Sequence, residues 1–432
     1  MEIWRKNLYS IWIAQFFAMI GMSMVVPFLP FYIRELGVTE PNDLEKWSGI
    51  VFAGPFILSF ILTPVWGALG DRFGKKTMVL RAILGLSISQ LLVGFSGDVY
   101  QLFIFRMFQG GVSGFIAASL ALVTASTPKE KSGHSIGILQ TSIAAGFIIG
   151  PLIGGFLADL TTHRNVFFIT SSMCFMSGIL IFFNVKEPPK VKDSRFFSVF
   201  ANYKYSFSNS KIRLALISIT VIQISIAMTF PTFALFIESF ELETAYISTI
   251  TGSLIGITGI ANVIAAPWWG KRNDTKGFRK NIFVAMIGAS IALGFHTFAL
   301  NVYELLPMRI LLGLCIGGLV PVFYSYINKH ITEDRKSGIM GIASSFTLLG
   351  NLIGPLLCTL FTFQFSLEYI FLVAGIILFV NAIIVRYYIV DLEIKKPKES
   401  VQIKSYGDNI KPGIYLKRKT EHILSQTSKN NK

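Results

Sequence analysis

The stretch PVWGALGDRFG at residues 64–74 returns as PWWGKRNDTKG at residues 267–277, and this repetition decides the fold. Both copies follow a long apolar run and share Pro, Trp-Gly, Asp and Gly at the same spacing. Other residues recur at an offset of 203–205, namely the pairs Pro27/Pro231, Arg106/Arg309, Gly110/Gly313, Gly150/Gly354 and Pro151/Pro355. Matches that stay in register indicate two parallel halves related by an axis along the membrane normal, as in alternating-access carriers.

The composition is that of a polytopic membrane protein. Of 432 residues 52% are apolar and only 15% are charged, whereas a soluble domain has about 25% charged residues. The apolar residues gather into runs of about 20, the length that a helix needs to cross a bilayer. This pattern excludes a soluble enzyme, a disordered chain and a disulfide-stapled secreted domain. The predicted spans are 8–33, 47–70, 76–96, 99–126, 133–158, 165–185, 212–237, 245–270, 281–300, 303–328, 337–363 and 367–390.

The fold class predicted from these runs is an all-α polytopic membrane protein. Twelve transmembrane helices form two pseudo-symmetric six-helix bundles, residues 1–185 and 212–390. The polar stretch 186–211 between them is a cytoplasmic linker, and residues 391–432 form a polar cytoplasmic tail.

The net charge of +15, from 39 Lys/Arg and 24 Asp/Glu, reports the topology. Basic residues crowd the even-numbered connections, whereas the odd-numbered ones hold only Arg34, Lys46 and Arg164. By the positive-inside rule both termini are expected to lie in the cytoplasm. The basic charge is a topology signal and a contact for anionic lipid, and no nucleic-acid partner is expected.

Four motifs carry a family resemblance that covers about residues 1–390. The first group resembles motif A of the major facilitator superfamily and consists of Gly67, Gly70, Asp71, Arg72, Gly74 and Lys75, with a second copy around Asp274. The second group, Arg106, Gln109 and Gly110, resembles motif B, and the third resembles the antiporter motif C with Gly146, Gly150, Pro151, Gly154 and Gly155. The fourth group, Gly21, Pro27 and Pro30, resembles the first-span motif of the twelve-span drug:proton antiporters. Details such as WSGIVF at residues 47–52 look most like the MdtG type of multidrug exporter.

The motif A residues are predicted to form a conformational latch. Asp71 lies just past the cytoplasmic end of the second span, where its carboxylate can meet a basic residue or a helix N-terminus. Such a contact would exist in only one of the two carrier conformations. The alternative is a positive-inside loop with one stray acid, and the second copy around Asp274 favours the latch.

Arg106 lies about 10 Å along its helix from the external end, at 1.5 Å per residue. A guanidinium at this depth is costly unless it faces a polar cavity or a partner. We expect it to hold an anionic substrate group or to act on a nearby carboxylate, whereas Arg309 can extend to the outer surface. The span that holds the motif C glycines is expected to pack closely across the halves against span eight and to bend as the halves rock.

The proton and substrate residues are less well defined by the sequence. No predicted span holds an acid at mid-depth, so Glu35 and Glu238, which end spans one and seven, are the candidates for proton coupling. His296 lies inside the predicted span 281–300, and it is expected to be a polar contact. Polar residues that could line a substrate cavity are Gln15, Gln140, Gln223, Asn262, Tyr324 and Asn351.

The function predicted is proton-coupled antiport that exports small amphiphilic compounds, including drugs, by alternating access. The resemblance implies a multi-pass protein of the bacterial inner (cytoplasmic) cell membrane. Its partners are the small-molecule substrate, protons and the lipid bilayer, and it is expected to act as a monomer. No cofactor, metal or enzymatic activity is predicted, because the chain has no Walker A sequence, metal cluster or nucleophile elbow. Alternatives are an exporter of one endogenous metabolite such as a siderophore, a sugar-type carrier, or a receptor or enzyme that uses the same fold.

Overall fold

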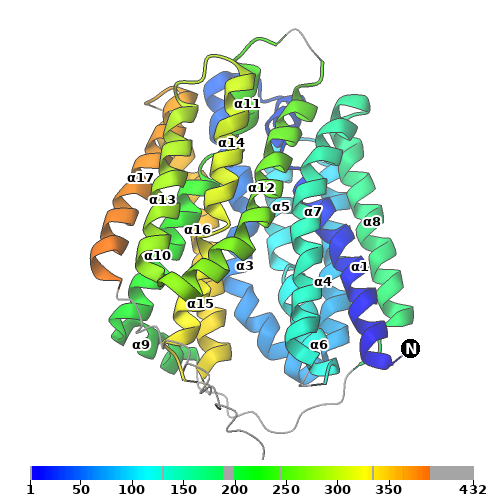
Figure 1. Ribbon diagram of the computed structural model, residues 1–432. Helices are drawn as coiled ribbons and strands as arrows, with labels where there is room; N and C mark the ends of the chain where they lie inside the picture. Colours follow the sequence, from blue (N-terminus) through cyan, green and yellow to red (C-terminus); the bar gives the residue numbers. More distant parts are fainter. Residues whose placement is uncertain are drawn as a thin grey trace, which may run out of the picture. The chain divides into compact units, whose positions relative to one another are not determined.

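The computed structural model describes residues 2–128, 131–187, 199–242, 245–332, 335–362 and 364–389. They belong to one compact unit, residues 1–392 (Figure 1). All regular structure in these ranges is helical. Eleven segments of the described chain are long and apolar enough to cross a membrane, and the bent pair α1 (Ile3–Met24) and α2 (Leu29–Glu35) makes a twelfth. The predicted all-α fold with twelve spans is confirmed.

The remaining helices follow the predicted spans closely. In the N-terminal half, residues 2–187, they are α3 (Pro41–Phe73), α4 (Lys75–Gly94), α5 (Val99–Gly111), α6 (Phe115–Ser126), α7 (Ser132–Leu160) and α8 (His163–Asn184). In the C-terminal half, residues 199–389, they are α9 (Val199–Ser208), α10 (Ser210–Ala227), α11 (Phe230–Glu238), α12 (Ile247–Lys276), α13 (Phe278–His296), α14 (Val302–Ile316), α15 (Val320–Lys329), α16 (Lys336–Thr362) and α17 (Leu367–Tyr388).

Three features of the helices differ from the prediction. Spans one, four, seven and ten are each divided into two helices, whereas the sequence predicted continuous spans. The second span begins at Pro41 rather than at residue 47, so Glu45 lies inside it. Part of the predicted linker is helical, as α9, and residues 188–198 and 390–432 lie outside the described residues. The boundaries of the linker and of the tail therefore stay predictions.

The breaks in spans one and seven occur at prolines that the repeat brings into register. Pro27 lies in the turn between α1 and α2, which meet at 57°. Pro231 is the second residue of α11, directly after the break from α10. Proline lacks the backbone donor that would continue the hydrogen-bond ladder, so both spans are interrupted near the same end.

The internal repeat is also present in hydrogen bonds at equivalent positions. Trp66 Nε1 donates to the carbonyl of Gly111 at 2.8 Å, and Trp269 Nε1 donates to the carbonyl of Leu314 at 2.7 Å. In the same way Ser87 Oγ donates to Ser171 O, and Ser290 Oγ donates to Gly375 O, both at 2.8 Å. The two halves therefore use the same contacts between corresponding helices.

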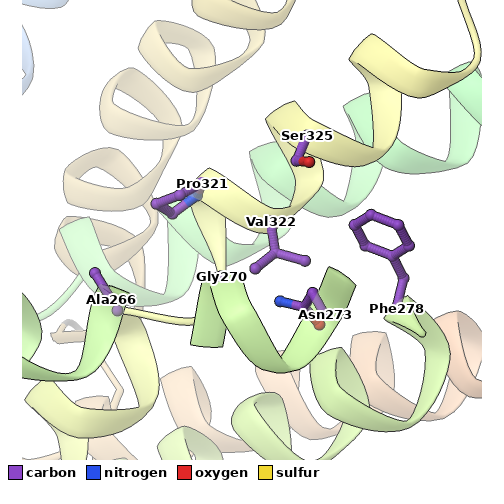
Figure 2. Close-up of a pocket in the computed structure, with 8 residues that line it drawn as sticks. Ala266, Gly270, Asn273, Phe278, Pro321, Val322 and Ser325 are labelled. Atoms are coloured by element: carbon purple, nitrogen blue, oxygen red, sulfur yellow. The ribbon is translucent and has the colours of Figure 1, made fainter. Parts of the chain in front are cut away.

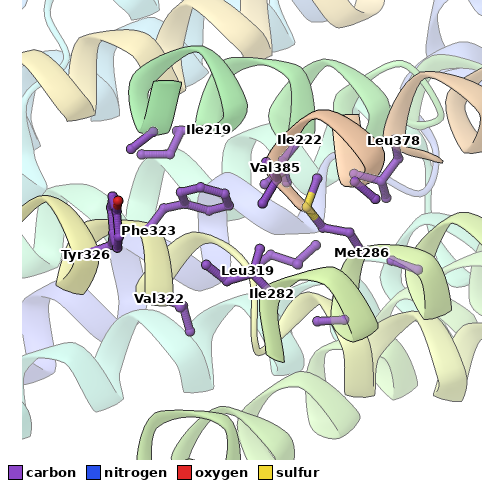
Figure 3. Packing of buried hydrophobic residues seen from close by; sticks show 14 of the residues in the cluster. Ile219, Ile222, Ile282, Met286, Leu319, Val322, Phe323, Tyr326, Leu378 and Val385 are labelled. Atoms are coloured by element: carbon purple, nitrogen blue, oxygen red, sulfur yellow. The ribbon is translucent and has the colours of Figure 1, made fainter. Parts of the chain in front are cut away.

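The core of the C-terminal half lies among α10, α13, α15 and α17 (Figure 3). Ile219, Phe323, Met286 and Leu378 come from these four helices, and each is fully buried. Large apolar side chains also cover the outside of the molecule; Phe183 is 76% exposed and Ile264 is 69% exposed. An apolar exterior of this kind suits contact with lipid rather than with water.

Two faces of the molecule are used below. The terminal face carries the helix ends at Ile3 and Tyr388, and the Arg34 face carries the opposite ends, including Arg34 and Glu238. In Figure 1 the Arg34 face is at the top, near α11, and the terminal face is at the bottom, near α9 and the N-terminus.

Candidate functional site

An ion pair joins the two halves at the Arg34 face. Nη1 of Arg34 donates to Oε1 of Glu238 at 2.7 Å, and Nη2 donates to Oε2 at 2.6 Å. Parallel bonds of this kind fix the geometry of the pair as well as its strength. The residues are 204 apart in sequence, so they occupy equivalent positions of the repeat. Equivalent positions can touch only near the axis that relates the halves, and the pair therefore lies at the centre of this face.

Two further contacts join the halves on the same face. The carboxylate of Asp159, at the end of α7, accepts hydrogen bonds from the backbone N–H of Ser248 and from the N–H and hydroxyl of Thr249, at 3.3, 2.7 and 2.7 Å. A carboxylate at the N-terminus of α12 satisfies unpaired N–H groups and is favoured by the helix dipole. On the same face, Thr359 Oγ1 of α16 donates to the carbonyl of Lys46 in α3 at 3.3 Å.

The motif C glycines allow close backbone packing on two sides of α7. A side chain at Gly155 would meet the backbone of Ser248, and one at Gly252 would meet the carbonyl of Pro151. This contact between α7 and α12 was predicted. Gly146, Gly150 and Gly154 instead lie against Met19, Ser23 and Met24 of α1, within the same half. The motif therefore serves packing within the N-terminal half as well as the predicted contact of α7 with α12.

The conformation described is closed at the Arg34 face. The cross-half hydrogen bonds and the ion pair described above all lie there. Apolar residues of both halves also share one buried cluster on this face, including Phe31 and Leu235. The contacts that hold the halves together are thus concentrated at one side.

The motif A residues stand at the terminal face. Gly67, Gly70, Asp71 and Arg72 lie in α3 and Asp274 lies in α12, but their side chains are outside the described residues. The latch therefore stays a prediction. Gly74 has a φ of +99° before α4, and its repeat partner Gly277 has a φ of +85° before α13. Only glycine adopts this conformation readily, which explains the recurrence of glycine at both turns.

Glu187 is a further residue of this region that the sequence reasoning missed. Its Oε1 accepts from the backbone N–H of Lys75 and its Oε2 from that of Lys76, both at 2.7 Å. The carboxylate therefore caps the N-terminus of α4 directly after the motif A loop. The start of the predicted linker is thus tied to motif A. The sequence signal that could have indicated this role is a single acid, Glu187, among the basic residues at the start of the predicted linker.

Asn7 fixes the same segment to the first helix. Its Nδ2 donates to the carbonyl of Lys186 at 2.9 Å, and its Oδ1 accepts from the Lys186 N–H at 2.9 Å. Asn7 is fully buried, so these bonds are shielded from solvent. The end of α8 is therefore held at two points, on α1 and on α4.

Arg106 and Arg309 are both buried. Arg106 is 8% exposed and donates from Nη1 to Gln109 Oε1 at 2.9 Å, while its Nε has no partner. Arg309 is 4% exposed, and its guanidinium carbon lies 3.4 Å from the centre of the Phe233 ring. Arg309 does not extend to the surface, so that alternative is wrong. Gly110, one position after Gln109, lies against the backbone of Pro55.

The two candidate proton carriers have different partners. Glu238 pairs with Arg34 across the halves. Glu35 Oε1 lies 2.6 Å from Nδ1 of His163, within the N-terminal half. Both carboxylates are at the Arg34 face, as predicted, and each faces a basic group. Their role in proton coupling stays a prediction.

The predicted substrate residues differ in how far they are exposed. Gln15 is fully buried, and neither atom of its amide has a partner. Gln140 is exposed, and the four others are half-buried, namely Gln223, Asn262, Tyr324 and Asn351. The Tyr324 hydroxyl lies 3.1 Å from Thr347 Oγ1 and so links α15 to α16. In this conformation Gln15 is therefore unsuited to contact a solute.

A small cavity lies between α12 and α15 (Figure 2). It has a volume of about 90 Å³ and is lined by residues that include Asn273, Val322 and Ser325. None of the predicted substrate residues lines it. Asn273 is buried, and neither atom of its amide has a protein partner. The volume suits about three water molecules rather than a drug.

The residues of the first-span motif lie at the bend of span one and at a close contact between helices. Pro27 lies in the break of span one, and Pro30 is the second residue of α2. A side chain at Gly21 would meet Thr170 of α8. These three residues therefore shape the first span and contribute no polar group to the site.

Comparison with known proteins identifies relatives across nearly the whole chain. Residues 11–258 and 215–426 match the family model described as Major Facilitator Superfamily. The chain is 34% identical over 382 residues to "Multidrug resistance protein MdtG" of Salmonella arizonae, covering 88% of this chain and 94% of that protein. It is also 34% identical over 385 residues to the protein of the same name from a Rahnella species, covering 88% and 92%.

A solved structure has the same fold. It is a bacterial homologue of the human lysosomal transporter Spinster in an inward-facing, unoccupied conformation. The TM-score is 0.72 at 13% sequence identity, over 89% of this chain and 96% of that one.

Proposed function

Because this chain belongs to the major facilitator superfamily of membrane transporters, we propose that it exports drugs and other small amphiphilic compounds by alternating access. The named relatives are multidrug resistance proteins that span nearly the same length. The observation that carries the proposal is the contact of Arg34 with Glu238 at equivalent positions of the two halves. A contact on the axis between halves is made in one conformation and lost when they rock apart.

The orientation follows from the basic loops. The terminal face, with Lys75, Lys76 and the linker, lies in the cytoplasm of a bacterial cell, and the Arg34 face lies outside. The conformation with Arg34 paired to Glu238 is then the one closed to the exterior. Substrate enters from the cytoplasmic side of this conformation and leaves when the Arg34 face opens.

Proton coupling is the finer part of the proposal. Protonation of Glu238 removes the negative charge that holds Arg34, so a proton favours opening of the Arg34 face. Glu35 and His163 form a second titratable pair on the same face. Antiport is supported by the resemblance of Gly150-Pro151 and its neighbours to motif C.

The test uses the full chain in proteoliposomes with a fluorescent amphiphilic drug, with and without an imposed pH gradient. We expect uptake against a concentration gradient in the wild type. The double variant Glu35→Gln/Glu238→Gln is expected to lose gradient-driven accumulation and to keep downhill flux. Glu368→Gln, an acid with no cross-half contact, is the control. Full accumulation by the double variant would contradict this assignment of the proton carriers.

A further inference from the structure

The contact between α3 and α16 is the repeat counterpart of the contact between α12 and α7. A side chain at Gly49 of α3 would meet Thr359 and the carbonyl of Pro355 in α16. In the same way a side chain at Gly252 of α12 would meet the carbonyl of Pro151 in α7. Both contacts join the N-terminal half to the C-terminal half, and the first of them is called the α3–α16 seam below.

A carboxylate stands at each of these contacts, but the two differ in their partners. At the end of α7, Asp159 accepts hydrogen bonds from Ser248 and Thr249 of α12. The acid at the α3–α16 seam is Glu45, and its side chain forms no hydrogen bond or ion pair with the described residues. Of the two carboxylates, Glu45 is therefore the unsatisfied one.

Glu45 lies on the face of α3 that packs against α16. It precedes Gly49 by four residues, so the two positions share one side of the helix. Its side chain lies near the thiol of Cys358, a fully buried residue of α16. The preceding residue, Leu44, belongs to the buried cluster that both halves share. Glu45 is half-buried in this conformation, so closure of the seam takes it partly out of water.

Glu45 has no cationic partner in the part of the chain that the structure describes. Arg34 is paired with Glu238. Lys46, although adjacent in sequence, forms no ion pair with Glu45. The helix dipole stabilises an anion mainly in the first turn, and Glu45 lies beyond it. The other titratable groups at this end of the helices around α3 are Cys358 of α16, Glu35 paired with His163, Tyr32 bonded to Val93, Asp98 at the start of α5, Tyr100 against Trp47 and Asp43 in the first turn of α3.

A carboxylate that lacks a partner costs less to bury once it is neutral. A proton bound to one Oε atom of Glu45 removes the charge before the side chain is enclosed between α3 and α16. When the seam opens, water again solvates the carboxylate and accepts the proton. Closure of the seam and binding of a proton to Glu45 are therefore linked.

We propose that Glu45 takes up a proton from the solution at the Arg34 face each time the α3–α16 seam closes, and returns it when the seam opens. Acid on that side then favours the closed conformation. A proton on Glu238 has the opposite effect, because it weakens the bond to Arg34. In the orientation proposed above this solution is the exterior, so Glu45 makes the opening of the carrier sensitive to external pH.

The experiment measures the width of the seam as the pH is changed. Spin labels are attached to cysteines introduced by Asn42→Cys and Gln364→Cys, two exposed residues at the start of α3 and just beyond the end of α16. Pulsed electron paramagnetic resonance on the full chain in lipid nanodiscs gives the distances between the two labels. We expect the ratio of the short to the long distance to rise about threefold or more from pH 8.5 to pH 6.

Variants of the labelled protein assign the response to Glu45. Glu45→Gln cannot ionise and should keep the short distance at both pH values, whereas Glu45→Asp should still respond to pH. Asp43→Asn is the matched control, since Asp43 is an exposed acid in the first turn of the same helix. It should respond as the labelled parent does. The response should also persist in the Glu35→Gln/Glu238→Gln protein, which separates Glu45 from the other two acids of this face.

Several outcomes contradict the proposal, and they can be told apart. Distances in the labelled parent that do not change with pH show that no proton acts on the seam. An unchanged pH response in Glu45→Gln assigns the proton to another residue, and so does loss of the response in Glu35→Gln/Glu238→Gln. These measurements need no substrate. Failure of drug uptake in proteoliposomes would therefore overturn the export function and leave this inference in place.

Discussion

At the scale of single residues, Arg34 and Glu238 act on the balance between conformations more than on folding. Both side chains are partly exposed, at 39% and 33%, so the pair is worth no more than about 1 kcal/mol. A difference of that size changes the ratio of two states by about fivefold. The same pair is therefore minor for stability and important for the opening of the Arg34 face.

We expect reversal of the charge at Arg34 or Glu238 to weaken closure of the Arg34 face, and reversal of both charges to restore it. Arg34→Glu or Glu238→Arg places like charges together and should favour the conformation open at the Arg34 face. The double reversal Arg34→Glu/Glu238→Arg restores the attraction. Labelling of a cysteine placed on this face measures its opening, and it should rise in each single variant and return in the double variant. Equal labelling in all four proteins would show that the pair does not hold the face closed.

Glu187 is expected to stabilise the loop between α3 and α4. Glu187→Gln removes a charged cap from the N-terminus of α4, which costs about 1 kcal/mol. The thermal unfolding midpoint in detergent should fall relative to the wild type. Glu368→Gln is the control, because Glu368 lies in the first turn of α17 but its side chain caps no helix. An equal fall in both variants would show that the cap itself is unimportant.

At the scale of helices, the contact of α7 with α12 depends on residues that have no side chain. Gly155→Ala places a methyl group on the backbone of Ser248, so the helices must separate. Overpacking of this kind costs about 1–3 kcal/mol. Gly137→Ala in the same helix is the control, since nothing lies within 4 Å of its added carbon.

We expect Gly155→Ala to lower both the unfolding midpoint and transport, and Gly137→Ala to change neither. Equal transport in the two variants would mean that close approach of α7 and α12 is not needed. The measurement is uptake by vesicles at matched protein levels.

The helices also show which features of the fold could be predicted from the sequence. Apolar runs predicted every span because crossing a bilayer leaves few alternatives to a helix. The breaks near Pro27 and Pro231 were not predicted, because a proline inside a span can also be accommodated without a break, as Pro151 is in α7. The pairing of Arg34 with Glu238 was within reach, since the repeat offset relates two opposite charges.

Other parts of the site depend on packing that no local pattern encodes. Asp159 directly follows the predicted span 133–158, but its bonds to Ser248 and Thr249 exist only after the halves meet. The burial of Arg309 under Phe233 likewise depends on how α11 lies against α14. Its sequence position is equally compatible with a side chain that extends to the surface.

At the scale of the whole molecule, the account requires that the Arg34 face opens during each transport cycle. The described contacts between halves are concentrated on that face, and the natural cysteines Cys174, Cys315 and Cys358 are all buried. Cysteines introduced by Arg34→Cys and Glu238→Cys can therefore be linked with little background.

The most direct measurement is transport by the Arg34→Cys/Glu238→Cys protein before and after its two introduced cysteines are cross-linked with a short bifunctional methanethiosulfonate. The disulfides that form in this cross-link are cleaved again by a reductant. Each single cysteine variant treated with the same reagent is the control. The account predicts that linking stops transport, that reductant restores it, and that the single variants remain active. Transport at an undiminished rate by the fully linked protein would contradict it.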